Sequence, residues 1–289
     1  MPVDSQTSQL VQYVSDSRKT YEADLKSLVD IAGVSMDPER KPEILRTADS
    51  AVALIKRMGG NAEIVQTSGD PVVIGSFKEV PGAPTVLVYN HLDVQPADAA
   101  EWKTPPFEMS TDGDTYRGRG TTDDKGPALA VLYAASYASE NQFPVNIKFV
   151  WELEEEIGSP SFEEFLKQNK AKLSCDSIVI SDTIWVSRER PAIPYGLRGL
   201  QGVLLKLKTG VKDVHSGTTG GLARNPIGEL CKLIDQCYDA KTGQVNIPGF
   251  YDGAREPSEE EGNQFVKSGF NIENFKKAHE LISLRTDDA

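Results

Sequence analysis

Three short apolar runs in this chain each end in side chains that can bind a metal ion. The run TVLVY leads into NHLD, IKFVW leads into ELEEE, and SIVI leads into SD. TVLVY is continuously apolar, which is typical of a strand that is covered on both faces, and we interpret the other two runs as buried strands as well. Helical patterns lie between them, so we predict an α/β fold with a mostly parallel sheet. Because ligands bind at the carboxyl ends of the strands in such sheets, we expect the three ends to form one site.

Other elements follow from hydrophobic periodicity. An apolar stripe at helical spacing predicts helices, and short apolar runs predict further strands. We expect helices over residues 21–32, 44–58, 126–138 and 159–169, and strands over 62–66, 72–77, 85–89, 147–153 and 177–182.

The pattern changes after Tyr195-Gly196, and we predict a domain boundary there, with domains 1–197 and 198–289. Residues 202–210 alternate between apolar and polar side chains, as a half-exposed strand does. Residues 224–240 predict an amphipathic helix with a proline near its start. The acidic stretch 255–262 is interpreted as a solvated loop.

Composition excludes several classes of protein. The formal net charge of −12 argues against binding to nucleic acid or to anionic membranes. No apolar run is long enough to cross a bilayer, and the polar first twenty residues lack a secretory core. The three cysteines are too few for a disulfide framework, so we predict buried free thiols and a cytoplasmic location.

His91 and Asp93 are two residues apart on the extended end of the first run. Side chains at this spacing point the same way. A histidine bound to metal usually donates its other ring N–H to a carboxylate, and Asp93 is spaced for that. The alternative is a surface His-x-Asp pair that arises by chance.

More carboxylates are spaced around this histidine. Asp123 and Asp124 lie in a glycine-rich loop before a helix, and Glu154–Glu156 directly follow a buried strand. An acidic run is usually a solvated face. Here, however, two neighbouring carboxylates at a strand end can divide the work, one binding metal and the other transferring a proton. An imidazole with several carboxylates suits zinc, manganese or cobalt.

Five segments taken together resemble a known family. YNHLDVQPAD, GRGTTDDKGP, ELEEEIGSP, VISD and YGLRG…DVHSG occur in the order of the signature segments of carnosinase-type metallopeptidases. That family includes glutamate carboxypeptidase, aminoacylase and succinyl-diaminopimelate desuccinylase, and the likeness is greatest to its cytosolic non-specific dipeptidases. The resemblance implies a three-layer catalytic domain, followed by an α+β lid and dimerisation domain.

The resemblance also implies a role for each matching residue. It implies two divalent metal ions, with zinc preferred over manganese or cobalt. His91 and Asp182 would bind one ion, Glu156 the other, and Asp123 both. Asp93 would orient His91.

The implied reaction is hydrolysis of the amide bond of a dipeptide by a metal-bridging water, with Glu155 as the general base. A cis peptide bond between Asp123 and Asp124 is implied as well. His215 would contact the substrate carbonyl from the neighbouring subunit of a homodimer. Two alternatives stay open: a desuccinylase or deacylase of N-acyl amino acids, and a truncated, inactive chain that serves only as a dimerising module.

The chain departs from the family pattern in two places. Asn90 stands where the residue before the metal histidine is commonly glycine. The family's chain is also longer, and a late histidine completes its second metal site. His279 lies in a polar helical pattern and is given no role. We therefore expect the chain to be C-terminally truncated, to bind at most one metal ion tightly and to hydrolyse dipeptides poorly.

Overall fold

The computed structural model describes residues 5–183, 185, 191–194, 196–197 and 199–285. The chain divides into two compact units, Met1–Ile184 and Trp185–Ala289. Tyr195 and Arg198 of the YGLRG segment lie outside the described residues, and the predicted domains 1–197 and 198–289 stay a prediction. Within the described part of the chain, no helix combines the length and the apolar character needed to cross a membrane.

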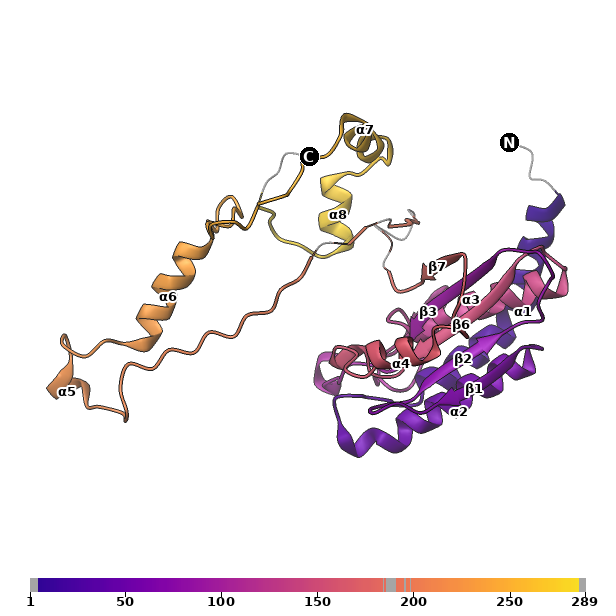
Figure 1. The fold of residues 1–289 in the computed structure, drawn as a ribbon, viewed down its shortest axis with the longest axis horizontal. Helices are drawn as coiled ribbons and strands as arrows, with labels where there is room; N and C mark the ends of the chain where they lie inside the picture. The colour runs from indigo at the N-terminus through magenta and orange to yellow at the C-terminus, as the bar shows by residue number, and fades with distance from the viewer. Residues whose placement is uncertain (1–4, 184, 186–190, 195, 198, 286–289) are drawn as a thin grey trace. The chain divides into compact units, whose positions relative to one another are not determined.

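The first unit is built from a sheet and the helices that cover it (Figure 1). Its order along the chain is α1 (Ser5–Val29), α2 (Lys41–Arg57), β1 (Asn61–Val65), β2 (Val72–Ser76), β3 (Thr85–His91), β4 (Ser110–Asp112), β5 (Thr115–Arg117), α3 (Lys125–Glu140), β6 (Asn146–Glu152), α4 (Phe162–Asn169) and β7 (Ser177–Ile180). Three short 3-10 helices lie between them: η1 (Pro38–Arg40), η2 (Ala99–Glu101) and η3 (Glu155–Ile157).

The main sheet has the strand order β1-β2-β6-β3-β7. Strand β3 runs parallel to both β6 and β7, whereas β1–β2 and β2–β6 are antiparallel pairs. The predicted α/β class is confirmed, but the sheet is mixed rather than mostly parallel. The short loop 66–71 explains part of this difference, because a parallel pair needs a long crossover connection and a short loop joins antiparallel strands.

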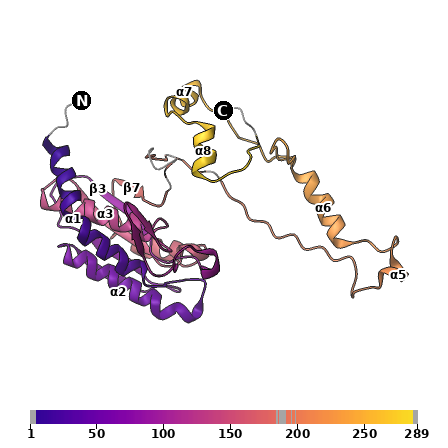
Figure 2. The ribbon, with the colours of Figure 1, turned by 180° about the vertical axis from the view of Figure 1, so that it is seen from behind.

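Helices cover both faces of this sheet. One core cluster joins α1, α2 and α3 to the face that carries Val73, Val88 and Phe149. The other joins Phe165 of α4 to the opposite face, which includes Leu87. Seen from behind, α1 and α2 lie in front of the sheet (Figure 2). Because successive residues of a strand point to opposite faces, each central strand contributes to both cores, and three layers result.

The register brings the polar strand ends together. His91 pairs with Glu152 across the parallel β3–β6 ladder, and Tyr89 pairs with Ile180 across β3–β7. Ser181 continues this second ladder, since its backbone N–H donates to the carbonyl of Tyr89 at 3.1 Å. The residues that follow β3, β6 and β7 therefore share one edge of the sheet.

Strand β7 was expected to be buried on both faces, and that expectation is wrong. Ile178, Val179 and Ile180 are 62%, 45% and 55% exposed. The strand pairs only with β3 and lies at the end of the sheet. None of its residues belongs to either of the core clusters of the described chain.

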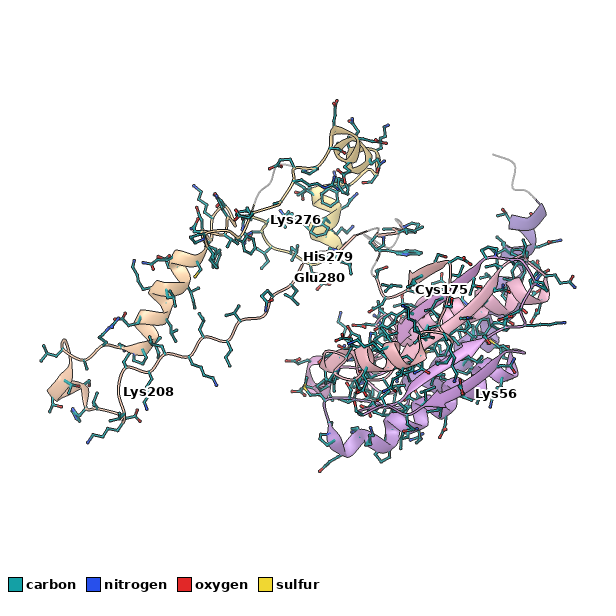
Figure 3. All side chains as sticks on the ribbon, in the orientation of Figure 1. Lys56, Cys175, Lys208, Lys276, His279 and Glu280 are labelled. Carbon is teal, nitrogen blue, oxygen red and sulfur yellow. The ribbon has the colours of Figure 1, made fainter. Side chains whose placement is uncertain are left out.

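The second unit contains α5 (Ser216–Thr219), α6 (Pro226–Cys237), α7 (Glu259–Lys267) and α8 (Ile272–Ala278). Helix α6 confirms the prediction of a helix over 224–240. Residues 202–210 form no strand, so that prediction is wrong; the segment around Lys208 is a single extended chain (Figure 3). The acidic stretch 255–262 is only partly a loop, because Ser258 and Glu261 form a capping box that begins α7.

The three cysteines are free, but the prediction that they are buried is wrong, because Cys231 is exposed and Cys175 and Cys237 are only half-buried. Cys175 is half-buried at the edge of the second core cluster and is labelled in Figure 3.

Candidate metal centre

His91 lies at the end of β3 and is fully buried. Its Nε2 atom is 2.8 Å from Oδ1 of Asp123 and 3.8 Å from Oδ2 of Asp182. One ligand atom from each of the three residues lies within 4.8 Å of the other two. The fold thus brings together three side chains that lie far apart in the sequence, at positions 91, 123 and 182.

This group fits a divalent metal ion. Zinc bonds to His nitrogen and carboxylate oxygen at about 2.0–2.2 Å, which places tetrahedral ligand atoms about 3.3 Å apart. The 2.8 Å and 3.8 Å separations of His91 from Asp123 and Asp182 lie on either side of that value. One imidazole and two carboxylates are also the donor types that zinc accepts.

The electrostatics of the group favour a cation. Burial lowers the pKa of His91, but hydrogen bonds to Asp123 and Asp93 outweigh it and raise that pKa to about 11. The hydrogen bond to His91 lowers the pKa of Asp123, whereas burial raises the pKa of Asp182. The imidazole is therefore charged when it faces these carboxylates alone. A bound metal ion would take the place of that proton, because metal ligands must be deprotonated.

Asp93 is fully buried behind the histidine. Its Oδ1 atom lies 3.4 Å from Nδ1 of His91. The same carboxylate accepts hydrogen bonds from the backbone N–H groups of Glu155 at 3.2 Å and Glu156 at 3.1 Å. Asp93 thus joins the strand end that carries His91 to the segment that carries the two glutamates.

Glu155 and Glu156 lie in η3, directly after β6, and both are partly exposed. Burial raises the pKa of each carboxyl, and neighbouring carboxylates raise it further. The Glu156 carboxylate accepts hydrogen bonds from Nε2 of Gln95 at 2.7 Å and from its backbone N–H at 3.2 Å. Gln95 was not singled out from the sequence, although it lies in the quoted segment YNHLDVQPAD.

Glu154 differs from the two glutamates that follow it. It is buried, and its carboxylate accepts hydrogen bonds from the backbone N–H groups of Ser161 at 2.7 Å and Asp70 at 2.8 Å, and from the Ser161 hydroxyl. A Cβ atom on Gly69 would lie 2.2 Å from its Oε2 atom. Glu154 therefore fixes the loop 66–71 and the start of α4.

Glu152 is a second buried carboxylate near the site. Its Oε1 atom accepts a hydrogen bond from the Tyr89 hydroxyl at 2.6 Å, and its Oε2 atom has no hydrogen-bond partner among the described residues. Burial raises the pKa of Glu152 to about 7. The sequence offered no signal that separates Glu152 from the other acidic residues in ELEEE.

The peptide bond between Asp123 and Asp124 is cis, as the resemblance implied. Burial raises the pKa of Asp124 to about 8, and its Oδ2 atom accepts the backbone N–H of His91 at 3.1 Å. The next residue, Lys125, is also buried and donates to the carbonyls of Leu28 at 2.8 Å and Ile31 at 2.7 Å, at the end of α1. These contacts fix the loop that carries Asp123.

His215 lies in the second unit, where it is exposed and precedes α5. Its Nδ1 atom accepts the backbone N–H of Gly217 at 2.9 Å. In the neutral ring the proton is then on Nε2, which is free to donate. His279 follows α8, as Figure 3 shows, and its ring lies 4.4 Å from that of Phe275.

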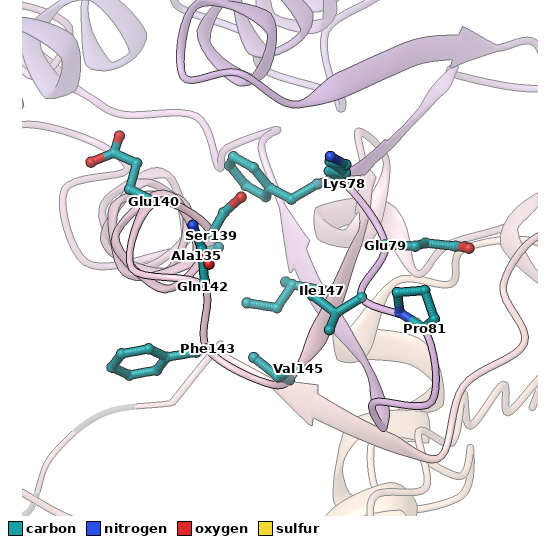
Figure 4. A pocket seen from close by; sticks show the side chains of 12 residues that line it. Lys78, Glu79, Pro81, Ala135, Ser139, Glu140, Gln142, Phe143, Val145 and Ile147 are labelled. Atoms are coloured by element: carbon teal, nitrogen blue, oxygen red, sulfur yellow. The ribbon is translucent and has the colours of Figure 1, made fainter.

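Two cavities lie elsewhere in the first unit. One of about 540 Å³ is bounded by the end of β2, the start of β6 and the end of α3, with Phe77, Glu140 and Ile147 in its lining (Figure 4). The other, of about 620 Å³, lies between α1 and α3. Neither is lined by a residue that the sequence assigned to the site.

The chain is similar to curated dipeptidases. It is 35% identical over 286 residues to human "Beta-Ala-His dipeptidase", covering 92% of this chain and 56% of that protein. It is 30% identical over 285 residues to "Cys-Gly metallodipeptidase dug1" of Schizosaccharomyces pombe, covering 93% of this chain and 60% of that protein. The chain thus spans little more than half the length of these relatives.

A solved structure gives the same result. The crystal structure of human carnosine dipeptidase 1 matches with a TM-score of 0.82 and 31% identity, covering 99% of this chain and 64% of that one. The family model for peptidase family M20/M25/M40 matches residues 87–273, a range that starts in β3 and includes the whole candidate centre. On the sequence of that range and on the shared fold, this chain belongs to peptidase family M20/M25/M40.

Proposed function

We propose that the first unit provides a catalytic metal centre for the hydrolysis of dipeptides. The observation that carries this proposal is the group of His91, Asp123 and Asp182. Glu155 follows the neighbouring strand β6, its backbone N–H donates to Asp93, and the charges of His91 and Asp182 affect the pKa of its carboxyl, which supports a role for Glu155 at the same centre.

His91, Asp123 and Asp182 would hold one divalent ion, and we propose zinc, with manganese or cobalt as alternatives. When bound, such an ion polarises a carbonyl oxygen and acidifies water. Glu156 would contribute to a second ion together with Asp123, and the charge of Asp123, which adds to the effect of burial in raising the pKa of the Glu156 carboxyl, supports this. Gln95 would hold the Glu156 carboxylate in place.

Glu155 would take a proton from the attacking water and deliver it to the leaving amine. Its raised pKa brings the carboxyl nearer to the operating pH, which suits a group that must accept and release a proton. Asp93 would keep Nδ1 of His91 oriented and, through two backbone hydrogen bonds, keep Glu155 beside the histidine.

His215 would donate a hydrogen bond from Nε2 to the substrate carbonyl, acting from the partner subunit of a homodimer. The hydrogen bond from Gly217 to its Nδ1 supports this role, because it leaves Nε2 as the protonated nitrogen of the neutral ring. The names of the relatives favour a dipeptide over an N-acyl amino acid as the substrate. A cytoplasmic location stays part of this proposal.

The test combines metal analysis with an activity assay on the same protein. The protein is freed of metal, reloaded with zinc or manganese, and assayed with β-Ala-His and Cys-Gly. We expect slow, metal-dependent release of free amino acids by the wild type, and loss of metal binding in Asp123→Ala and in His91→Ala. A wild-type protein that takes up no metal, or that hydrolyses neither dipeptide when loaded, would refute the proposal.

A further inference from the structure

Asn90 joins the three segments that carry the predicted ligands of the first metal ion. Its side chain is fully buried. The Nδ2 atom donates to Oδ2 of Asp124 at 2.8 Å and to the backbone carbonyl of Ser181 at 2.9 Å. Both partners are acceptors, so they determine which end of the amide carries the nitrogen.

Each acceptor is the immediate neighbour of a predicted ligand. Asp124 follows Asp123, and Ser181 precedes Asp182. Oδ2 of Asp124 also accepts the backbone N–H of His91 at 3.1 Å. A single amide group therefore connects the loop before α3, the end of β7 and the strand that carries the histidine.

The direction of the side chain keeps Asn90 away from the metal. Val88 points to the face of the sheet covered by α1, α2 and α3, and Asn90 is two residues further along the same strand. Residues two apart share a face, so Asn90 points toward the start of α3 while His91 points to the other face. Asn90 can set the spacing of the ligands without competing to be one.

We propose that Asn90 is a positioning residue that fixes the distance between Asp123 and Asp182 around His91. This inference rests on the proposed function, since it concerns the same centre. Glycine, which is common at this position in the family pattern, could make neither bond. It would leave the Ser181 carbonyl without this donor and the buried Asp124 carboxylate with one donor fewer. Loss of a partner that orients a metal ligand typically weakens metal binding by about 10–100-fold.

The experiment measures the affinity of the metal-free, 289-residue protein for zinc, by competition with a chelator at fixed pH. We expect Asn90→Gly to bind zinc about 10-fold more weakly than the wild type. Asn90→Asp should bind more weakly still, because it keeps the shape but places a carboxylate without donors against Asp124. If only charge mattered, the added carboxylate would tighten zinc binding instead.

A swapped pair shows whether the effect passes through Asp124. In the double variant Asn90→Asp/Asp124→Asn the donor is on residue 124 and the acceptor on residue 90, with the total charge of the wild type. We expect it to regain part of the affinity that Asn90→Asp loses. The recovery should be partial, because the swap leaves the Ser181 carbonyl without a donor and places an amide against the His91 N–H. Asn90→Asp, which leaves no cavity, gives an answer if Asn90→Gly folds poorly.

Asn146 provides a matched control at the other end of the neighbouring strand. Its side chain makes three hydrogen bonds to the backbone of Val80 and Ala83. Asn146→Gly should lower the melting temperature and leave the affinity for zinc unchanged.

Two results would overturn the inference: zinc binding by Asn90→Gly within twofold of the wild type, or tighter zinc binding by Asn90→Asp than by the wild type. If the wild type itself binds no zinc, the proposed function fails as well. If the wild type binds zinc and Asn90→Gly binds equally well, only the inference about Asn90 fails.

Discussion

Oδ1 of Asp93 lies 3.4 Å from Nδ1 of His91, on the side of the ring opposite the nitrogen that faces Asp123. The same carboxylate accepts the backbone N–H groups of Glu155 and Glu156. One buried side chain thus lies against the histidine ring and binds the segment of the glutamates, and Nδ1 of His91 also lies 3.1 Å from the backbone carbonyl of Asp93. A substitution of Asp93 should therefore disturb both the histidine and the glutamates, although Asp93 is not one of the candidate ligands.

Asp93→Asn should weaken zinc binding by about 10–100-fold, the range seen when an orienting carboxylate is lost. The amide NH2 would replace either Oδ1, which faces His91 and the N–H of Glu155, or Oδ2, which faces the N–H of Glu156, so in either case a donor would face a donor. The measurement is the zinc affinity of the metal-free protein. Asp98→Asn is the control, because Asp98 is exposed and its side chain accepts the backbone N–H of Ala100, away from the centre. Equal affinities for zinc in the two variants would show that Asp93 does not orient the histidine.

Glu155→Gln should abolish dipeptide hydrolysis while zinc stays bound. A base is needed for proton transfer, and its loss typically costs about 10²–10⁴ in rate. Turnover and bound zinc are measured on the same sample. Glu164→Gln, on the exposed face of α4, should change neither of them. Turnover by Glu155→Gln at the rate of the Glu164→Gln control would rule out Glu155 as the base.

Glu154→Gln should destabilise the fold and leave zinc binding intact. Both oxygens of the Glu154 carboxylate accept hydrogen bonds: Oε1 from the N–H and the hydroxyl of Ser161, and Oε2 from the N–H of Asp70. An amide nitrogen there would face a donor, and one such buried mismatch costs about 1–3 kcal/mol. Urea unfolding and metal analysis test both parts. A folded Glu154→Gln protein that has lost its zinc would identify Glu154 as a ligand instead.

Glu152→Gln should raise the stability of the metal-free protein at pH 8. The pKa of Glu152 is raised from 4.5 to about 7 by burial. Because the folded protein holds the Glu152 proton more tightly than the unfolded chain does, the contribution of this group to stability is fully present below pH 4.5. That contribution is lost as the pH rises through 7, where the buried carboxyl must ionise. Since one pKa unit corresponds to about 1.4 kcal/mol, the variant should gain up to about 3 kcal/mol at pH 8 and little at pH 4.5.

The measurement is urea unfolding in EDTA at both pH values. Glu108→Gln, at an exposed position, should show no such difference between the two pH values. A Glu152→Gln protein that is no more stable than the wild type at pH 8 would show that Glu152 is not held in its neutral form by the fold.

The sequence alone determined which elements carry the centre. The apolar runs predicted β3 and β6, and their polar ends drew attention to His91 and to the glutamates after β6. These features are local, because a strand that is covered on both faces must be apolar and a metal site must interrupt it with polar side chains. The pattern of five segments added the family, which the comparisons confirm.

Only the tertiary structure decided how neighbouring residues of one type differ. Glu152, Glu154 and Glu155 belong to one acidic run, yet the first accepts a hydrogen bond from Tyr89, the second accepts from Ser161, and the third is partly exposed. The same holds for Asn90, which the sequence marked only as a departure from glycine. Its partners Asp124 and Ser181 come from other elements and are 34 and 91 positions away. Such differences depend on contacts between distant segments, and no local pattern of hydrophobicity or charge contains them.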